Sequence, residues 1–85
     1  MNFTCPVCGF GRLTSSPRDT HGHGSLELCP CCGFQFGVDD DDRHWSYDRW
    51  RAVWIAEGMN WRGAQQPPAG WDPRTQLGAI GRRAL

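Results

Sequence analysis

The chain has 85 residues, 39% of them apolar, and its nine basic and nine acidic residues give a formal net charge of +0. We expect a single domain spanning residues 1–85, too short to rely on its hydrophobic core alone for stability. The balanced charge argues against a protein that binds nucleic acid mainly by electrostatics, because such proteins carry a basic surplus.

Two copies of one cysteine motif lie in the first half of the chain. Residues 5–10 read C-P-V-C-G-F and residues 29–34 read C-P-C-C-G-F, with 20 residues between the inner cysteines. The proline presets the turn between two thiols, and the glycine can adopt a positive φ that aims backbone N–H groups at sulfur. Two such turns facing each other form a closed tetrahedral site, most often for Zn²⁺. The predicted metal ligands are Cys5, Cys8, Cys29 and Cys32.

A disulfide framework is the competing interpretation of these cysteines. Their number, five, is odd, and the chain runs into the first motif without a signal peptide. No apolar stretch approaches the ~20 residues needed to span a membrane. We therefore expect a cytoplasmic protein with one Zn²⁺ per chain, with iron as the alternative, and a net charge near −2 once four thiolates hold a dication.

We expect residues 3–37 to form a zinc ribbon, a rubredoxin-like β-hairpin of two or three short strands. One strand is predicted near 12–15 and another over 25–28, with a loop rich in turn-forming residues between them. Residues 34–36 alternate and are a candidate third strand with both phenylalanine rings on one side. The predicted fold class is a small metal-bound α+β domain.

The acidic run 39–42 is predicted to be a solvated turn that leads into a helix. A calcium loop would need a glutamate at its twelfth position, where this chain has Trp50, so the calcium pattern fails. The helix is predicted over 46–57, with Ser46 as N-cap and Gly58 as its stop. Its aromatic stripe should cover the open face of the ribbon.

Residues 58–85 are predicted to be an irregular extension packed on the ribbon, with one short helix. Asp72 as N-cap followed by Pro73 at the first helical position is typical of a helix start. This helix should hold Leu77 and Ile80.

The second motif and the tryptophans after it form a recognisable pattern. Residues 29–37 read C-P-C-C-G-F-Q-F-G and precede the acidic run, and W-I-x-x-G-x-x-W follows over residues 54–61, with Trp71-Asp72 and Gln76-Leu77 beyond. Over roughly residues 4–78 the chain resembles the cysteine-rich CPCC family of small bacterial proteins. The resemblance implies a small bacterial zinc-binding protein without an established activity, and it supplies no catalytic residues.

Three other side chains have a structural and a functional interpretation. Cys31 occupies the place of Val7 in the first motif, so we expect a small, partly buried side chain beside the site, with a redox-active thiol as the alternative. His21 and His23 lie in a glycine-rich loop. We expect this loop to be solvated, with a second metal site as the alternative.

The five tryptophans divide into two groups. Trp50 and Trp54 recur at helical spacing and are expected in the core, although a stacking platform for ligands or bases is the alternative. Trp45, Trp61 and Trp71 lie outside the main helix and are candidates for a partner-facing patch.

The function predicted from these features is a non-catalytic zinc-binding module that binds another protein. The motifs found are structural, and the sequence shows no nucleophile–base pair or phosphate-binding loop. A rubredoxin-like iron electron carrier is one alternative, because four thiolates also hold iron. A nucleic-acid-binding ribbon is another, and it would use the arginines at positions 12, 18, 43, 49, 51 and 62.

Overall fold

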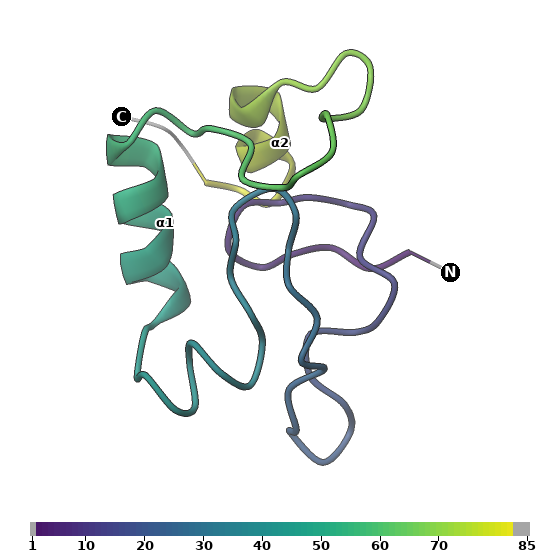
Figure 1. Ribbon diagram of the computed structural model, residues 1–85, viewed down its shortest axis with the longest axis vertical. Coiled ribbons are helices and arrows are strands. Elements are labelled where there is room, and N and C mark those ends of the chain that lie inside the picture. The colour runs from purple at the N-terminus through teal and green to yellow at the C-terminus, as the bar shows by residue number, and fades with distance from the viewer. Residues whose placement is uncertain (1, 83–85) are drawn as a thin grey trace.

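A computed structural model describes residues 2–82, which fold into one body with a radius of gyration of 12.1 Å. Figure 1 shows helix α1 (Tyr47–Ala56) along one side and the shorter α2 (Pro73–Ala79) above the crossing segments of the first half. Within the described residues, no helix is long and apolar enough to cross a membrane. The ends of the predicted domain, residues 1 and 83–85, lie outside the described part of the chain.

Both helices begin where the sequence predicts. The Ser46 hydroxyl accepts the Arg49 N–H at 3.0 Å and caps α1, which gives way to Gly58 at φ 101°. Asp72 caps α2, Leu77 is fully buried beneath it, and Ile80 lies one residue beyond its last turn. The first helix is confirmed within one residue at each end. The predicted start of the second is also confirmed, but it ends one residue before Ile80, which it was expected to hold.

The predicted strands are wrong as extended strands. Across residues 2–82 the pairing consists of three isolated antiparallel bridges, which join Phe3 to Leu13, Arg18 to Gly24 and Leu28 to Gln35. The first half is therefore a set of turns stapled by single bridges.

The carboxylate of Glu27 explains why the hairpin does not pair. It accepts the N–H groups of Thr14 and Ser15, each at 3.0 Å, and so takes donors that a neighbouring strand would use. Leu26 has φ 66°, a left-handed conformation that interrupts any strand over 25–28. Leu26 and Leu28 are consequently exposed, at 62% and 58%.

The core lies around the two cysteine motifs. Phe34 and Phe36 are fully buried with ring centroids 5.2 Å apart, so their rings do lie on one side as predicted. Tyr47 and Trp50 of α1 pack edge-on against Phe34 at 5.3 and 5.2 Å. Trp54 is fully buried and donates its indole N–H to the Asn60 carbonyl at 3.0 Å. The stripe on α1 thus covers the second motif. Trp54 is a core residue as predicted, whereas Trp50 is partly buried against the core.

The acidic run is only partly solvated, which corrects the prediction for its first half. Asp39 is 6% exposed and accepts the Gln35 N–H at 2.8 Å. Asp40 accepts the Gly37 N–H at 2.7 Å and forms an ion pair with Arg18. These carboxylates hold the turn before α1 in shape.

Candidate metal centre

The first cysteine motif folds into a tight turn, which we call knuckle 1 (residues 5–10). The Cys5 N–H donates to the Phe10 carbonyl at 2.7 Å, and the Gly9 N–H donates to the Cys5 carbonyl at 2.9 Å. Gly9 has φ 88°, which a residue with a Cβ rarely adopts. The Gly9 N–H therefore closes the turn on a carbonyl. The sequence analysis had instead expected backbone N–H groups of this turn to be directed at sulfur.

The second motif, knuckle 2 (residues 29–34), repeats this geometry. The Cys29 N–H donates to the Phe34 carbonyl at 2.9 Å, the Gly33 N–H donates to the Cys29 carbonyl at 2.8 Å, and Gly33 has φ 80°. Equal sequence thus produces equal local structure at two places in the chain.

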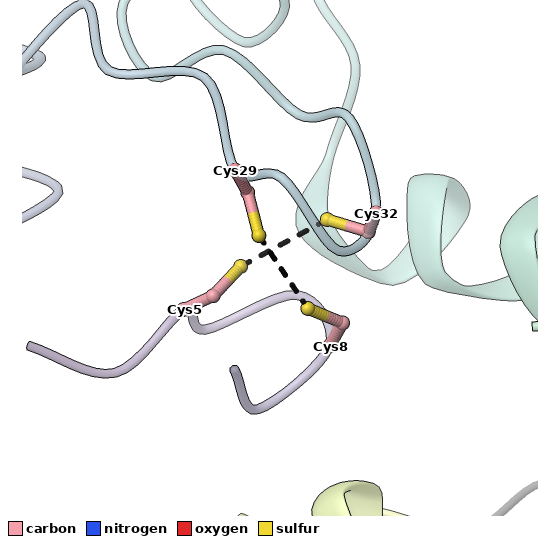
Figure 2. Close-up of side chains that lie close together, drawn as sticks. All are labelled: Cys5, Cys8, Cys29 and Cys32. Atoms are coloured by element: carbon pink, nitrogen blue, oxygen red, sulfur yellow. Dashed lines mark hydrogen bonds between the residues drawn. The ribbon is translucent and has the colours of Figure 1, made fainter. Parts of the chain in front are cut away.

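The knuckles bring four sulfurs to one point (Figure 2), with two from each loop directed at a common centre. All four cysteines are fully buried, and their Sγ atoms lie within 4.8 Å of one another. The Sγ atoms of Cys5 and Cys32 are 3.9 Å apart, and those of Cys8 and Cys29 are 3.7 Å apart. A tetrahedron with Zn–S bonds of 2.3 Å has edges of about 3.8 Å, whereas a disulfide bond measures about 2.05 Å. The group is thus spaced to hold a metal ion and not to form disulfides.

The thiols interact strongly before any metal binds. Hydrogen bonds from the Cys29 and Cys32 thiols lower the pKa of Cys5. Neighbouring thiols, that of Cys29 foremost, together with burial raise the pKa of Cys8 and of Cys32. A metal ion held by these thiols would have to displace their protons, so its binding would release protons.

Arg51 of α1 attaches the helix to knuckle 1. Its side chain is almost fully buried, and its guanidinium donates to the Val7 carbonyl at 2.6 Å and the Pro6 carbonyl at 2.7 Å. A third bond at 2.6 Å joins it to the exposed carboxylate of Asp48. Arg51 is therefore not available for the nucleic-acid surface that the alternative interpretation assigned to it.

Two further side chains bind the last cysteine of each knuckle at its carbonyl. The Gln76 amide on α2 donates to the Cys8 carbonyl at 2.9 Å, and the Trp50 indole on α1 donates to the Cys32 carbonyl at 3.0 Å. Both helices are thereby tied to the backbone that carries the sulfurs.

Cys31 is fully buried, which corrects the expectation of partial burial. Its sulfur lies 3.3 Å from the Gln76 amide nitrogen. A hydrogen bond from the Cys8 thiol and a weaker one from Gln76 lower the pKa of Cys31. Cys31 is not part of the four-sulfur group.

The remaining predicted candidates lie apart from this group. His21 and His23 are exposed on a loop shaped by Asp19, whose carboxylate accepts both histidine backbone N–H groups at 2.8 and 2.9 Å. No further metal-binding cluster occurs among residues 2–82.

Most of the arginines suggested for nucleic-acid binding have partners within the chain. Arg18 pairs with Asp40 and Asp41, and Arg62 pairs with Glu57. Arg43 lies 4.0 Å from Asp39, and Arg49 lies 4.8 Å over the Trp45 ring. Arg51 is buried, so among the described residues Arg12 is the member of this group without a partner.

Comparisons with known proteins identify neither a family nor an activity. No protein-family model and no solved structure matches the chain. The chain is similar to the uncharacterised protein YoaQ of Bacillus subtilis (strain 168), with 35% identity over 40 residues. That segment covers 46% of this chain and 34% of YoaQ, so the match spans about a third of the relative.

Proposed function

We propose that Cys5, Cys8, Cys29 and Cys32 bind one Zn²⁺ and that the metal-stabilised chain is a non-enzymatic module that binds another protein. The observation that carries the proposal is the convergence of four fully buried sulfurs within 4.8 Å. Four thiolates complete a tetrahedral shell and leave no open position for a reacting water, which supports a structural metal.

The hydrogen bonds around the knuckles support a role for the metal in folding. Arg51, Trp50 and Gln76 tie both helices to knuckle carbonyls, so the helices depend on the shape of the turns. A small domain of this kind gains on the order of 10 kcal/mol from its structural zinc. We further propose that the first half is a zinc ribbon reduced to its knuckles, in a cytoplasmic member of the CPCC family.

The choice of a protein partner over nucleic acid rests on the side chains left at the surface. Trp61 and Trp71 are half-buried and keep part of their rings accessible, as tryptophans at protein interfaces do. By contrast, most of the arginines are occupied by intramolecular contacts.

The test of the metal proposal is elemental analysis of protein purified without added metal, together with a visible spectrum. We expect about one zinc per chain, a colourless solution, and loss of the folded far-UV spectrum on chelation. A red protein containing iron would establish the electron-carrier alternative instead. A folded protein that is indifferent to chelators would contradict a structural metal altogether.

The test of the interaction is capture from the native host, with tagged wild type and a metal-free Cys5→Ser variant side by side. We expect a protein partner that is retained by the metal-loaded wild type alone. Capture of nucleic acid, lost at high salt, would contradict a protein partner.

A further inference from the structure

Two adjoining cavities lie beside knuckle 1, with volumes of about 570 and 420 Å³. They share Phe10, Arg12 and Pro68, and we call the pair the aromatic groove. Each volume lies within the range of about 300–1,000 Å³ that is usual for ligand sites. The shared residues make the two cavities one continuous candidate site.

The floor of the groove is a chain of aromatic rings in edge-to-face contact. Phe10 lies 5.5 Å from Trp61, and Trp61 lies 5.4 Å from Trp71, measured between ring centroids. Both indole N–H groups are already used, by the Gln65 carbonyl at 2.7 Å and the Gln76 side-chain oxygen at 3.1 Å. The indole rings are therefore fixed in place. Phe10 is only 7% exposed, so the half-buried Trp61 and Trp71 offer most of the apolar surface, which suits proline and aliphatic side chains.

The groove is assembled by both knuckles. Phe10 belongs to knuckle 1 and Pro30, which lines the same cavity, to knuckle 2. Trp61 follows α1 and Trp71 precedes α2. The groove consequently exists only when the two knuckles face each other across the four sulfurs.

The groove lining carries one cation, Arg12, and one anion, Asp72, and no ion pair joins the two. Arg12 is exposed, lines both cavities and has no ion pair or side-chain hydrogen bond among the described residues. The other charged residue of the lining is Asp72, whose two carboxylate oxygens accept the Arg74 N–H at 3.1 Å and the Thr75 hydroxyl at 2.8 Å. These bonds lower the pKa of Asp72 and occupy it as the cap of α2. Arg12 is thus available to a carboxylate from outside.

We propose that the aromatic groove binds an extended acidic peptide segment of a partner protein. Proline or aliphatic side chains of the segment pack on Phe10, Trp61 and Trp71, and a neighbouring glutamate or aspartate pairs with Arg12. This inference rests on the proposed protein-binding function and names its site. A single-stranded nucleic acid would need cations along its backbone, and the groove supplies one.

The experiment uses metal-loaded full-length protein and displayed peptides of about eight residues, which extend over roughly 27 Å. Three libraries carry a fixed central glutamate, glutamine or lysine among random positions. The variants are Arg12→Gln, the charge reversal Arg12→Glu, and Arg74→Gln as a matched exposed arginine outside the groove. Metal content and far-UV circular dichroism confirm that each variant is folded.

We expect wild type and Arg74→Gln to select the glutamate library over the glutamine library by about tenfold or more, with proline and aliphatic residues enriched beside the glutamate. Arg12→Gln should lose this preference, and Arg12→Glu should move it to the lysine library. Equal selection from all three libraries, or unchanged selection by the Arg12 variants, overturns the proposal. So does displacement of the selected peptides by oligothymidylate at low salt.

The outcomes separate this inference from the function on which it rests. A partner captured from the host equally by wild type and Arg12→Gln would leave a protein-binding module and refute the groove as its site. Absence of both peptide selection and a captured partner, in protein that holds its metal, would refute the interaction itself.

Discussion

Replacing Arg51 with methionine should uncouple α1 from the metal centre. The change removes the hydrogen-bond donors to the carbonyls of Val7 and Pro6. Val7 is fully buried. A hydrogen bond from a charged donor contributes about 1.5–3 kcal/mol, and the ion pair with exposed Asp48 about 0–1 kcal/mol. We therefore expect a loss of about 3–5 kcal/mol, a large part of the 5–15 kcal/mol typical of a domain.

The assays are urea unfolding of the metal-loaded protein, followed by tryptophan fluorescence, and competition for zinc with a chromophoric chelator. If metal binding and folding are coupled, the loss appears as an apparent zinc affinity weaker by about a hundredfold to several thousandfold. Arg49→Met on the same helix is the control, because Arg49 is exposed and its contact with Trp45 contributes under about 1 kcal/mol. A free energy of unfolding for Arg51→Met within about 0.5 kcal/mol of the wild-type value would refute the reasoning.

Three further predictions follow from the geometry of the knuckles. Cys32→Ser should abolish stoichiometric metal binding while the neighbouring Cys31→Ser retains it, as elemental analysis will show; equal loss in both would mean that Cys31 is a ligand. Because neighbouring thiols and burial raise the pKa of Cys8, zinc affinity should fall with falling pH by about tenfold per unit for each proton displaced, and a pH-independent affinity in chelator competition would contradict this. Gly9→Ala places a Cβ 2.5 Å from the Gln76 carbonyl oxygen at φ 88°, so its melting temperature should drop clearly, whereas Gly78→Ala in open space on α2 should be neutral or slightly stabilising.

The cysteine site was predictable because its signals are local. Each knuckle is six residues long, and its proline, its glycine and its two thiols fix one turn wherever that turn occurs. The helix starts are local for the same reason, since Ser46 bonds an amide three residues away and Asp72 an amide two residues away. The cysteine turns and the helix starts, which depend on residues within a few positions of each other, could therefore be predicted from the sequence.

The predicted strands failed because a distant side chain competes for their backbone. Glu27 meets the amides of Thr14 and Ser15 across 13 and 12 residues of sequence, and propensity carries no information about such a contact. The left-handed φ of Leu26 was equally unpredictable, because leucine seldom adopts it. The alternating pattern over 25–28 was present, but these two tertiary facts decided the outcome.

The helical spacing around Arg51 did indicate that it is buried, but the charge of its side chain argued for exposure. Arg51 lies four residues after Tyr47 and three before Trp54, on the helical row that faces the core. Helical spacing therefore favours burial, while residue type favours exposure. Gln76 gave no comparable warning, since its contact with Cys8 spans 68 residues.

The buried charge of Arg51 gains a physical reason once the metal is considered. Burying a guanidinium is costly even when it is hydrogen-bonded, and an apolar side chain would fill the same helical face at less cost. When four thiolates surround a dication, however, the centre carries two negative charges inside the core. A cation bonded to the carbonyls of Pro6 and Val7, on the turn between two of the proposed ligands, would offset part of that charge, so we expect Arg51 to stabilise the metal-loaded state more than the protonated one. Docking of α1 and metal binding should then be cooperative, and we expect α1 to detach first when the metal leaves.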